Sequence, residues 1–179
     1  MKKLSTINDT WLLTACGIGG VVLVLCAFLP WVTYRFNAEG LPQAEAAALP
    51  ISWNAHGFDV EAVAGFGDGY VVATAGAVIA AISGIALLGP DRPWNAVLSL
   101  LVSGGLAFGI AAYDLSRKFT EPISRAGPSG NFSGFAHGDA TAVLPTIVCI
   151  ALAVATLGAL LLLRQRNELS MAASTDASA

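Results

Sequence analysis

Residues 11–34 read WLLTACGIGGVVLVLCAFLPWVTY and include no charged side chain. A helix rises about 1.5 Å per residue and the hydrocarbon layer of a bilayer is about 30 Å thick, so about 20 apolar residues span it. Three further uncharged runs are long enough to do the same, at residues 70–88, 94–113 and 142–163. The sequence therefore predicts an all-α membrane protein, a four-transmembrane-helix antiparallel bundle.

The composition agrees with a chain that lies mostly in lipid. Hydrophobic residues make up 55% of the 179 residues and charged residues 12%, which is about half the share in an ordinary soluble domain. The spans and their connections use most of the length, so no separate soluble domain of ordinary size is expected. The net charge of −3 offers no basic surface, which excludes nucleic acid and leaves the lipid bilayer as the first predicted partner.

The four spans divide the chain into two tails and a transmembrane domain. The tails are residues 1–10 and residues 167–179, and the second is small, polar and predicted to be disordered. The transmembrane domain covers residues 11–166, with two extracytoplasmic loops at about 35–69 and 114–140. We expect the first span to be a retained anchor, because its apolar run is too long for a signal peptide and no clear cleavage site follows it.

Lysine and arginine near the membrane predict the orientation. An even number of spans places both termini on one side, together with five basic residues in short segments. These are Lys2, Lys3, Arg92, Arg164 and Arg166. The opposite side carries Arg35, Arg117, Lys118 and Arg125 in longer loops. The two counts are close, but the higher density of basic residues predicts that the N- and C-termini are cytoplasmic.

Small residues at four-residue spacing indicate where the helices can approach each other. Lipid is as apolar as a leucine side chain, so helices in a membrane associate through close packing rather than through burial from water. The predicted packing residues are Gly76, Ala80 and Gly84 in the second span, Gly105 and Gly109 in the third, and Ala151, Ala155 and Ala159 in the fourth. Either these stripes face one another, or some of them face another membrane protein or a second copy of the chain.

Two short patterns recur along the chain. The motif Gly65-Phe66-Gly67-Asp68 precedes the second span, and Gly134-Phe135-Ala136-His137-Gly138-Asp139 precedes the fourth. Gly19-Gly20 in the first span is likewise echoed by Gly104-Gly105 in the third. Two parallel copies of a helix–loop–helix hairpin would explain the pattern. The alternative is that glycine and aspartate are common wherever a loop enters a helix.

The spans carry no ionisable group at depth, which argues against an ion-coupled transporter or pump. Asp68 is interpreted as the N-cap of the second helix. In the loops, four residues could bind zinc if the two loops meet, namely His56, Asp59, His137 and Asp139. Their spacing is only weakly specific, and solvated or capping roles are the preferred interpretation. The sequence thus predicts no catalytic residue, no metal site and no cofactor.

Aromatic residues of the loops are the other candidates for contact with a partner. They are Trp53, Phe58, Phe66, Phe132 and Phe135. Exposed aromatic side chains often anchor binding partners, and they also insert into the lipid headgroup layer. A third interpretation, which we favour, is that they pack the two loops together as a cap.

Three motifs carry a resemblance to a known group of proteins. Phe28-Leu29-Pro30-Trp31-Val32-Thr33 leaves the first span, Gly65-Phe66-Gly67-Asp68-Gly69 enters the second, and Tyr113-Asp114-Leu115-Ser116-Arg117 ends the third. With these motifs the chain resembles four-span actinobacterial inner-membrane proteins. The resemblance implies a multi-pass protein of the bacterial inner (plasma) membrane, and it implies no activity.

Three classes of function remain open. The leading hypothesis is a non-catalytic integral membrane accessory or scaffold subunit that docks onto a larger envelope complex, such as a transporter or a respiratory assembly. The second is a carrier of lipid or small molecules, or a channel formed by a homo-oligomer. The third is a metal-dependent sensor or enzyme that uses the histidines and aspartates of the loops.

Overall fold

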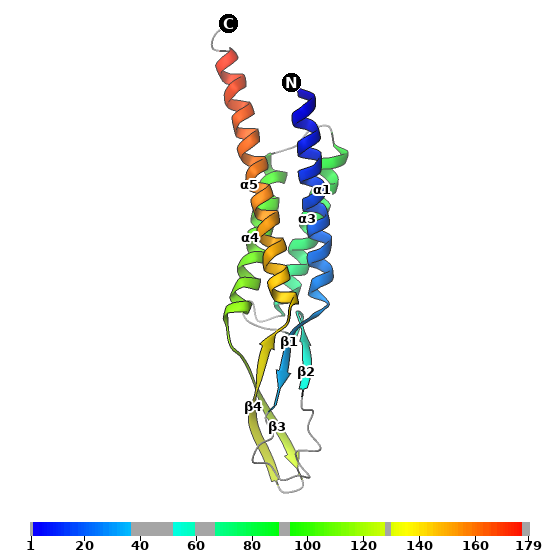
Figure 1. The fold of residues 1–179 in the computed structure, drawn as a ribbon, viewed down its shortest axis with the longest axis vertical. Helices are drawn as coiled ribbons and strands as arrows, with labels where there is room; N and C mark the ends of the chain where they lie inside the picture. Colours follow the sequence, from blue (N-terminus) through cyan, green and yellow to red (C-terminus); the bar gives the residue numbers. More distant parts are fainter. Residues whose placement is uncertain (1, 37–51, 60–66, 90–93, 128–129, 177–179) are drawn as a thin grey trace.

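The computed structural model describes residues 2–36, 52–59, 67–89, 94–127 and 130–176. Within these ranges four helices and four strands follow one another along the chain. The helices are α1 (Lys2–Ala27), α3 (Asp68–Leu88), α4 (Trp94–Ser116) and α5 (Val143–Asp176). The strands are β1 (Pro30–Arg35), β2 (Ser52–His56), β3 (Phe119–Gly127) and β4 (Gly130–Ala140). The helices run side by side, the strands project from one end of them, and both termini lie at the other end (Figure 1).

Each helix contains a segment that is long and apolar enough to cross a membrane. The segments are Asp9–Ala27, Asp68–Leu88, Asn95–Ser116 and Val143–Asn167. The prediction of four such helices is therefore confirmed. The first one ends at Ala27 rather than near Tyr34, because the chain leaves the helix before Pro30 and enters β1.

The helices pack in a ring. α1 packs mainly on α3 and α4 mainly on α5, while α3 contacts α4 and α1 contacts α5. Side chains buried among them include Leu13, Leu23, Ile79, Leu100 and Ile147. Many large apolar side chains point outward instead, among them Trp11, Ile18, Ile85, Leu88 and Val102. An apolar exterior of this kind suits helices whose surroundings are lipid.

The connections at the strand end form one sheet, so the all-α prediction is wrong for this part of the chain. The strand order is β2-β1-β4-β3, and all neighbours are antiparallel. β3 and β4 form a hairpin within the predicted extracytoplasmic loop at about 114–140. β4 also pairs with β1, from Val32 opposite Ala140 to Arg35 opposite His137. The backbone hydrogen bonds between β1 and β4 join segments far apart in the sequence. The glycine-rich sequence of β4 has a low strand propensity and does not by itself predict this pairing.

The last helix also extends beyond its predicted end. α5 continues to Asp176, whereas the sequence predicts disorder from residue 167 onward. Leucine, methionine, glutamate and alanine in this segment are good helix formers. Because they follow a helix that is already nucleated, the chain can continue helically past Arg164 without new tertiary contacts.

The two halves of the chain share an element order of helix, strand, strand and helix. Gly20 of α1 packs against α3, and Gly104 of α4 packs in the same way against α5. The sheet does not share this symmetry, because exchanging the halves would turn the order β2-β1-β4-β3 into β4-β3-β2-β1. The aspartates of the repeated motif also differ, since Asp68 is buried at the start of α3 whereas Asp139 is exposed on β4.

Candidate functional site

Two carboxylates are completely buried where the helices meet the sheet. Asp68 is the first residue of α3 and Asp114 lies in the last turn of α4, and the exposed fraction of each is 0%. α3 begins and α4 ends at the strand side of the molecule, and the two helices contact each other (Figure 1). Aspartate is almost never fully buried unless it is paired, so this position requires an explanation.

Arg117 is the cationic member of this site. Its Nε lies 3.2 Å from Oδ1 of Asp114, and its side chain is mostly buried, with 24% exposed. The guanidinium also lies over the ring of Phe119, 4.7 Å from the ring centre, in a cation–π contact. Asp114 interacts electrostatically with Asp68 as well. We call Asp68, Asp114 and Arg117 the charged cluster, and it connects α3, α4 and the first residue of β3.

The glycine-rich turn before α3 sets the position of Asp68. The Gly69 N–H donates a hydrogen bond to the carbonyl of Gly57, at 2.7 Å. A Cβ atom on Gly67 would collide with the backbone of Phe58, and one on Gly69 would collide with the backbone of Gly57. Only glycine therefore lets the turn after β2 lie directly against the first turn of the helix.

The predicted N-cap role of Asp68 is wrong. The N-cap position is occupied by Gly67, which has no side chain to accept a capping hydrogen bond, and Asp68 is already the first residue of the helix. A carboxylate in the first turn still interacts favourably with the helix dipole. This favourable interaction offsets part of the cost of burying Asp68.

Three exposed aromatic side chains lie near the strand end of the helices, where the charged cluster is found. At least half of the surface of Phe28, Tyr70 and Tyr113 is exposed. Tyr70 and Tyr113 lie at the strand ends of α3 and α4, and Phe28 directly follows α1. Trp11 is exposed near the opposite end of the apolar segment Asp9–Ala27 of α1. Tyrosine and tryptophan collect at membrane–water interfaces. Tyr70 and Tyr113 are close in sequence to the two buried aspartates, so this arrangement is typical of a cluster at interfacial depth.

The aromatic loop residues that the sequence offers as candidates for contact with a partner lie in different surroundings. The Phe58 ring lies between those of Phe28 and Tyr70, with ring centres 4.9 and 4.6 Å away. Trp53 stacks on Tyr34 of the neighbouring strand at 5.3 Å. Phe135 is exposed on β4. Phe66 and the side chain of Phe132 lie outside the described residues.

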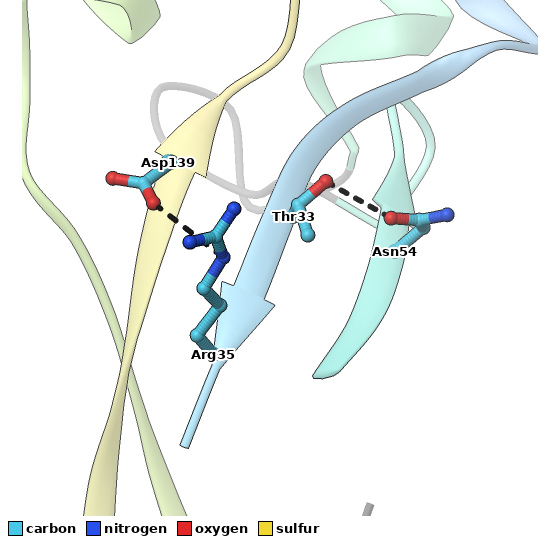
Figure 2. A network of polar contacts seen from close by, with 4 residues as sticks. All are labelled: Thr33, Arg35, Asn54 and Asp139. Carbon is cyan, nitrogen blue, oxygen red and sulfur yellow. Dashed lines mark hydrogen bonds and ion pairs between the residues drawn. The ribbon is translucent and has the colours of Figure 1, made fainter. Parts of the chain in front are cut away.

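The structure does not bring the four zinc candidates together. His56 lies opposite Pro30 and His137 lies opposite Arg35, so five residues of β1, or about 17 Å, separate the two positions. Asp139 is 4.0 Å from Arg35, and Figure 2 shows this pair beside the hydrogen bond from Thr33 to Asn54. Asp59 accepts a hydrogen bond from the backbone N–H of His56 instead. Within the described ranges no three histidine, cysteine, aspartate or glutamate residues form a potential metal-binding group.

The predicted packing residues divide into contacting and open positions. A Cβ on Gly76 would lie 2.6 Å from the Gly20 carbonyl oxygen, and one on Gly20 would lie 2.7 Å from the nitrogen of Ala80. On the other side of the ring, Gly104 packs against Ala151 and Ala155 in the same way. At three other positions a Cβ would meet no atom within 4 Å, namely Gly84, Gly105 and Gly109. Ala159 is half-buried, and its neighbour Gly158 makes the close approach to Leu101.

The sequence predicts Asp68 and Asp114 in two different extracytoplasmic loops, and no motif indicates that they lie close together. Their positions along the predicted pair of antiparallel helices do indicate that they lie at the same level. Asp68 lies 20 residues before Leu88, and Asp114 lies 20 residues after Trp94. Two helices of similar length that run in opposite directions place such residues at about the same level.

No protein-family model, curated protein or solved structure matches this chain. A function can therefore be inferred only from the arrangement of this chain's own residues. In that arrangement a buried set of charges lies at the junction between the apolar helices and the sheet.

Proposed function

We propose that the protein is a non-catalytic accessory or scaffold subunit of a bacterial inner membrane, which docks onto a larger envelope complex such as a transporter or a respiratory assembly. A docking subunit needs a recognition surface that is held in a fixed position relative to its membrane anchor. The attachment of the sheet to α1 and α5 is the observation that carries the proposal.

Trp31 is central to this attachment. Its side chain is fully buried, and its indole N–H donates a hydrogen bond to the carbonyl of Cys26 in the last turn of α1, at 2.9 Å. The backbone N–H of Thr141, just before α5, donates to the carbonyl of Trp31 at 2.8 Å. The Thr141 hydroxyl donates to the carbonyl of Pro30. These hydrogen bonds connect the beginning of β1 to the last turn of α1 and to Thr141, the residue between the end of β4 and the start of α5.

One face of the sheet offers a surface for a partner. Directly opposite residues of antiparallel strands lie on the same face. Ser52, Arg35, His137 and Thr120 are opposite one another across all four strands, and each is exposed. We call these four residues the polar row. It combines a cation, an imidazole and two hydroxyls, so it can make directed hydrogen bonds to a protein surface.

The proposal includes an orientation. The helices would form an antiparallel bundle with both termini in the cytoplasm and the sheet on the outer side of the membrane. The density of basic residues near the termini supports this orientation. Arg164 and Asp9 also pair at the terminal end, with Nη1 and Oδ1 3.1 Å apart, as suits a polar membrane surface. The choice of a bacterial inner membrane rests on the resemblance to four-span actinobacterial proteins.

Co-purification in mild detergent tests the docking role. We expect a tagged protein expressed in its native host to retain a defined membrane partner, and the Arg35→Ala/His137→Ala variant to retain several-fold less of it. The matched control is Arg166→Ala, an exposed basic residue at the terminal end, which should retain the same amount as the wild type. A lone monomer, or equal recovery with the double variant, would contradict the proposal.

Cysteine accessibility tests the orientation. We expect a Thr120→Cys variant to react in intact cells with a thiol reagent that does not cross the inner membrane. An Asn167→Cys variant should react only after the cells are broken. Both positions are exposed in the structure, so the difference reports the membrane side rather than burial. Labelling of Asn167→Cys in intact cells would overturn the orientation.

The open glycine positions of α4 favour a second candidate function. Gly105 and Gly109 are exposed and have no neighbouring atom at Cβ distance. A lipid chain or a helix of a second copy could approach this face closely. This supports the alternative of a lipid or small-molecule carrier or an oligomeric channel, and a stable oligomer that retains lipid would favour it over a docking subunit.

A further inference from the structure

Asp114 has unused hydrogen-bonding capacity in a buried position. Its side chain has 0% exposure, and neither carboxyl oxygen accepts a hydrogen bond in the described part of the chain. Arg117 Nε lies 3.2 Å from Oδ1, but this contact is an ion pair without hydrogen-bond geometry. A buried polar atom without a hydrogen bond is costly, so the site favours an additional donor.

The neighbouring Asp68 can supply that donor only if one of the two groups carries a proton. Ionised carboxylates have acceptor atoms alone, so two of them cannot hydrogen-bond to each other. Two buried negative charges side by side also repel strongly, and this repulsion favours binding of a proton by one of them. A bound proton converts the repulsion into a hydrogen bond. It also leaves one negative charge, which the single guanidinium of Arg117 balances.

We propose that Asp68 and Asp114 form a proton-binding site in which one proton is held between the two carboxyl groups and Arg117 balances the remaining charge. The inference does not depend on the docking role. Among the described residues, the charged groups that act on Asp114 are Asp68 from α3 and Arg117 after α4. The turn packed against the start of α3 contributes Gly57 and Phe58, which carry no charge.

The proton affects how the helices hold the sheet. The charged cluster joins α3 and α4, and Arg117 contacts Phe119 at the start of β3. Loss of the proton at high pH would leave two carboxylates facing one guanidinium. The junction between α3, α4 and β3 would then weaken. The site lies at the strand end of the helices, so it would respond to the pH on that side of the membrane.

Infrared spectroscopy of the full-length protein in lipid nanodiscs tests the proposal directly. We expect the wild type to show, at neutral pH, the C=O stretching band of a protonated carboxylic acid, which shifts in D₂O and disappears reversibly as the pH is raised. The Asp68→Asn variant should lack the band, because Asp114 then stays ionised beside Arg117. The control Asp139→Asn, which changes an exposed aspartate, should retain it. Absence of the band in the wild type, or its persistence in Asp68→Asn, would overturn the proposal.

The pH dependence of thermal unfolding gives a second readout. We expect the melting temperature of the wild type and of Asp139→Asn to fall by about 4 °C or more as the pH rises from about 6 to about 9. In Asp68→Asn the amide donates to Asp114 without a bound proton, so its melting temperature should change much less over this range. Parallel curves for all three proteins would contradict a shared proton. If Asp68→Asn does not fold, the wild-type infrared titration decides alone.

Discussion

The Asp114→Ala variant is expected to lose about 3–5 kcal/mol of the free energy of unfolding, because it removes a fully buried carboxylate that forms an ion pair with the mostly buried Arg117 guanidinium. Arg117 cannot lose its charge, and its contacts with Phe119 hold it in place. The measurement is chemical unfolding in mixed micelles, followed by tryptophan fluorescence. The unfolding free energies of the variant and the wild type are compared in the same micelle composition.

The matched control is Asp139→Ala. Asp139 also pairs with an arginine, but its Oδ2 lies 4.0 Å from Arg35 Nε and both side chains are more than 70% exposed. Solvent screens such pairs, so the stability should hardly change. In the double variant Asp114→Ala/Arg117→Ala the loss should be smaller than the sum of the two single losses, because each single change already removes the same ion pair. Equal losses for Asp114→Ala and Asp139→Ala would show that the charged cluster does not stabilise the fold.

The second large effect is expected at Gly76. A Cβ atom there would lie 2.6 Å from the Gly20 carbonyl oxygen, so Gly76→Ala must push α1 and α3 apart. We expect it to cost about 1–3 kcal/mol of unfolding free energy, which the same unfolding experiment measures.

Gly84→Ala is the control for this prediction, because Gly84 lies two turns along the same helix and belongs to the same predicted stripe. No atom lies within 4 Å of a Cβ there, so the added methyl group fits without displacement. Alanine also loses less backbone entropy than glycine in a helix, and the variant should gain about 0.5–1 kcal/mol. A loss of stability in both variants would contradict the helix packing.

If both predictions hold, stability is concentrated in two kinds of contact. One is close backbone packing in the middle of the helix pairs, where only glycine fits. The other is the set of buried charges at the junction with the sheet. The first kind holds the membrane helices together, and the second links them to the surface that we propose as the docking site. Variants of the polar row should therefore affect binding without affecting stability.

The apolar runs could be predicted from composition and length alone. Residues 70–88 form a helix almost as predicted, because a long uncharged segment has few other ways to satisfy its backbone in lipid. The stripe of Gly76 and Ala80 could also be recognised as a packing surface. The sequence could not separate Gly76 from Gly84, because the same four-residue spacing fits both and only the position of α1 distinguishes them.

The sheet and the charged cluster could not be predicted in this way. β3 and β4 lie in a segment rich in glycine and polar residues, and β4 pairs with β1 across about 100 residues of sequence. Asp68 and Asp114 belong to different helices. Their burial follows from how those helices lie against each other and against the turn at Gly57.

The amino-acid sequence by itself determined the number of helices that are long and apolar enough to span a membrane and their approximate limits, because the cost of placing a charge or an unpaired backbone group in lipid acts on each segment separately. The tertiary structure alone decided that the two connections share one sheet, which glycines touch a neighbouring backbone, and that two aspartates and an arginine meet in a buried site. These features depend on pairwise distances between segments far apart in the chain, and no local pattern of residues specifies such distances.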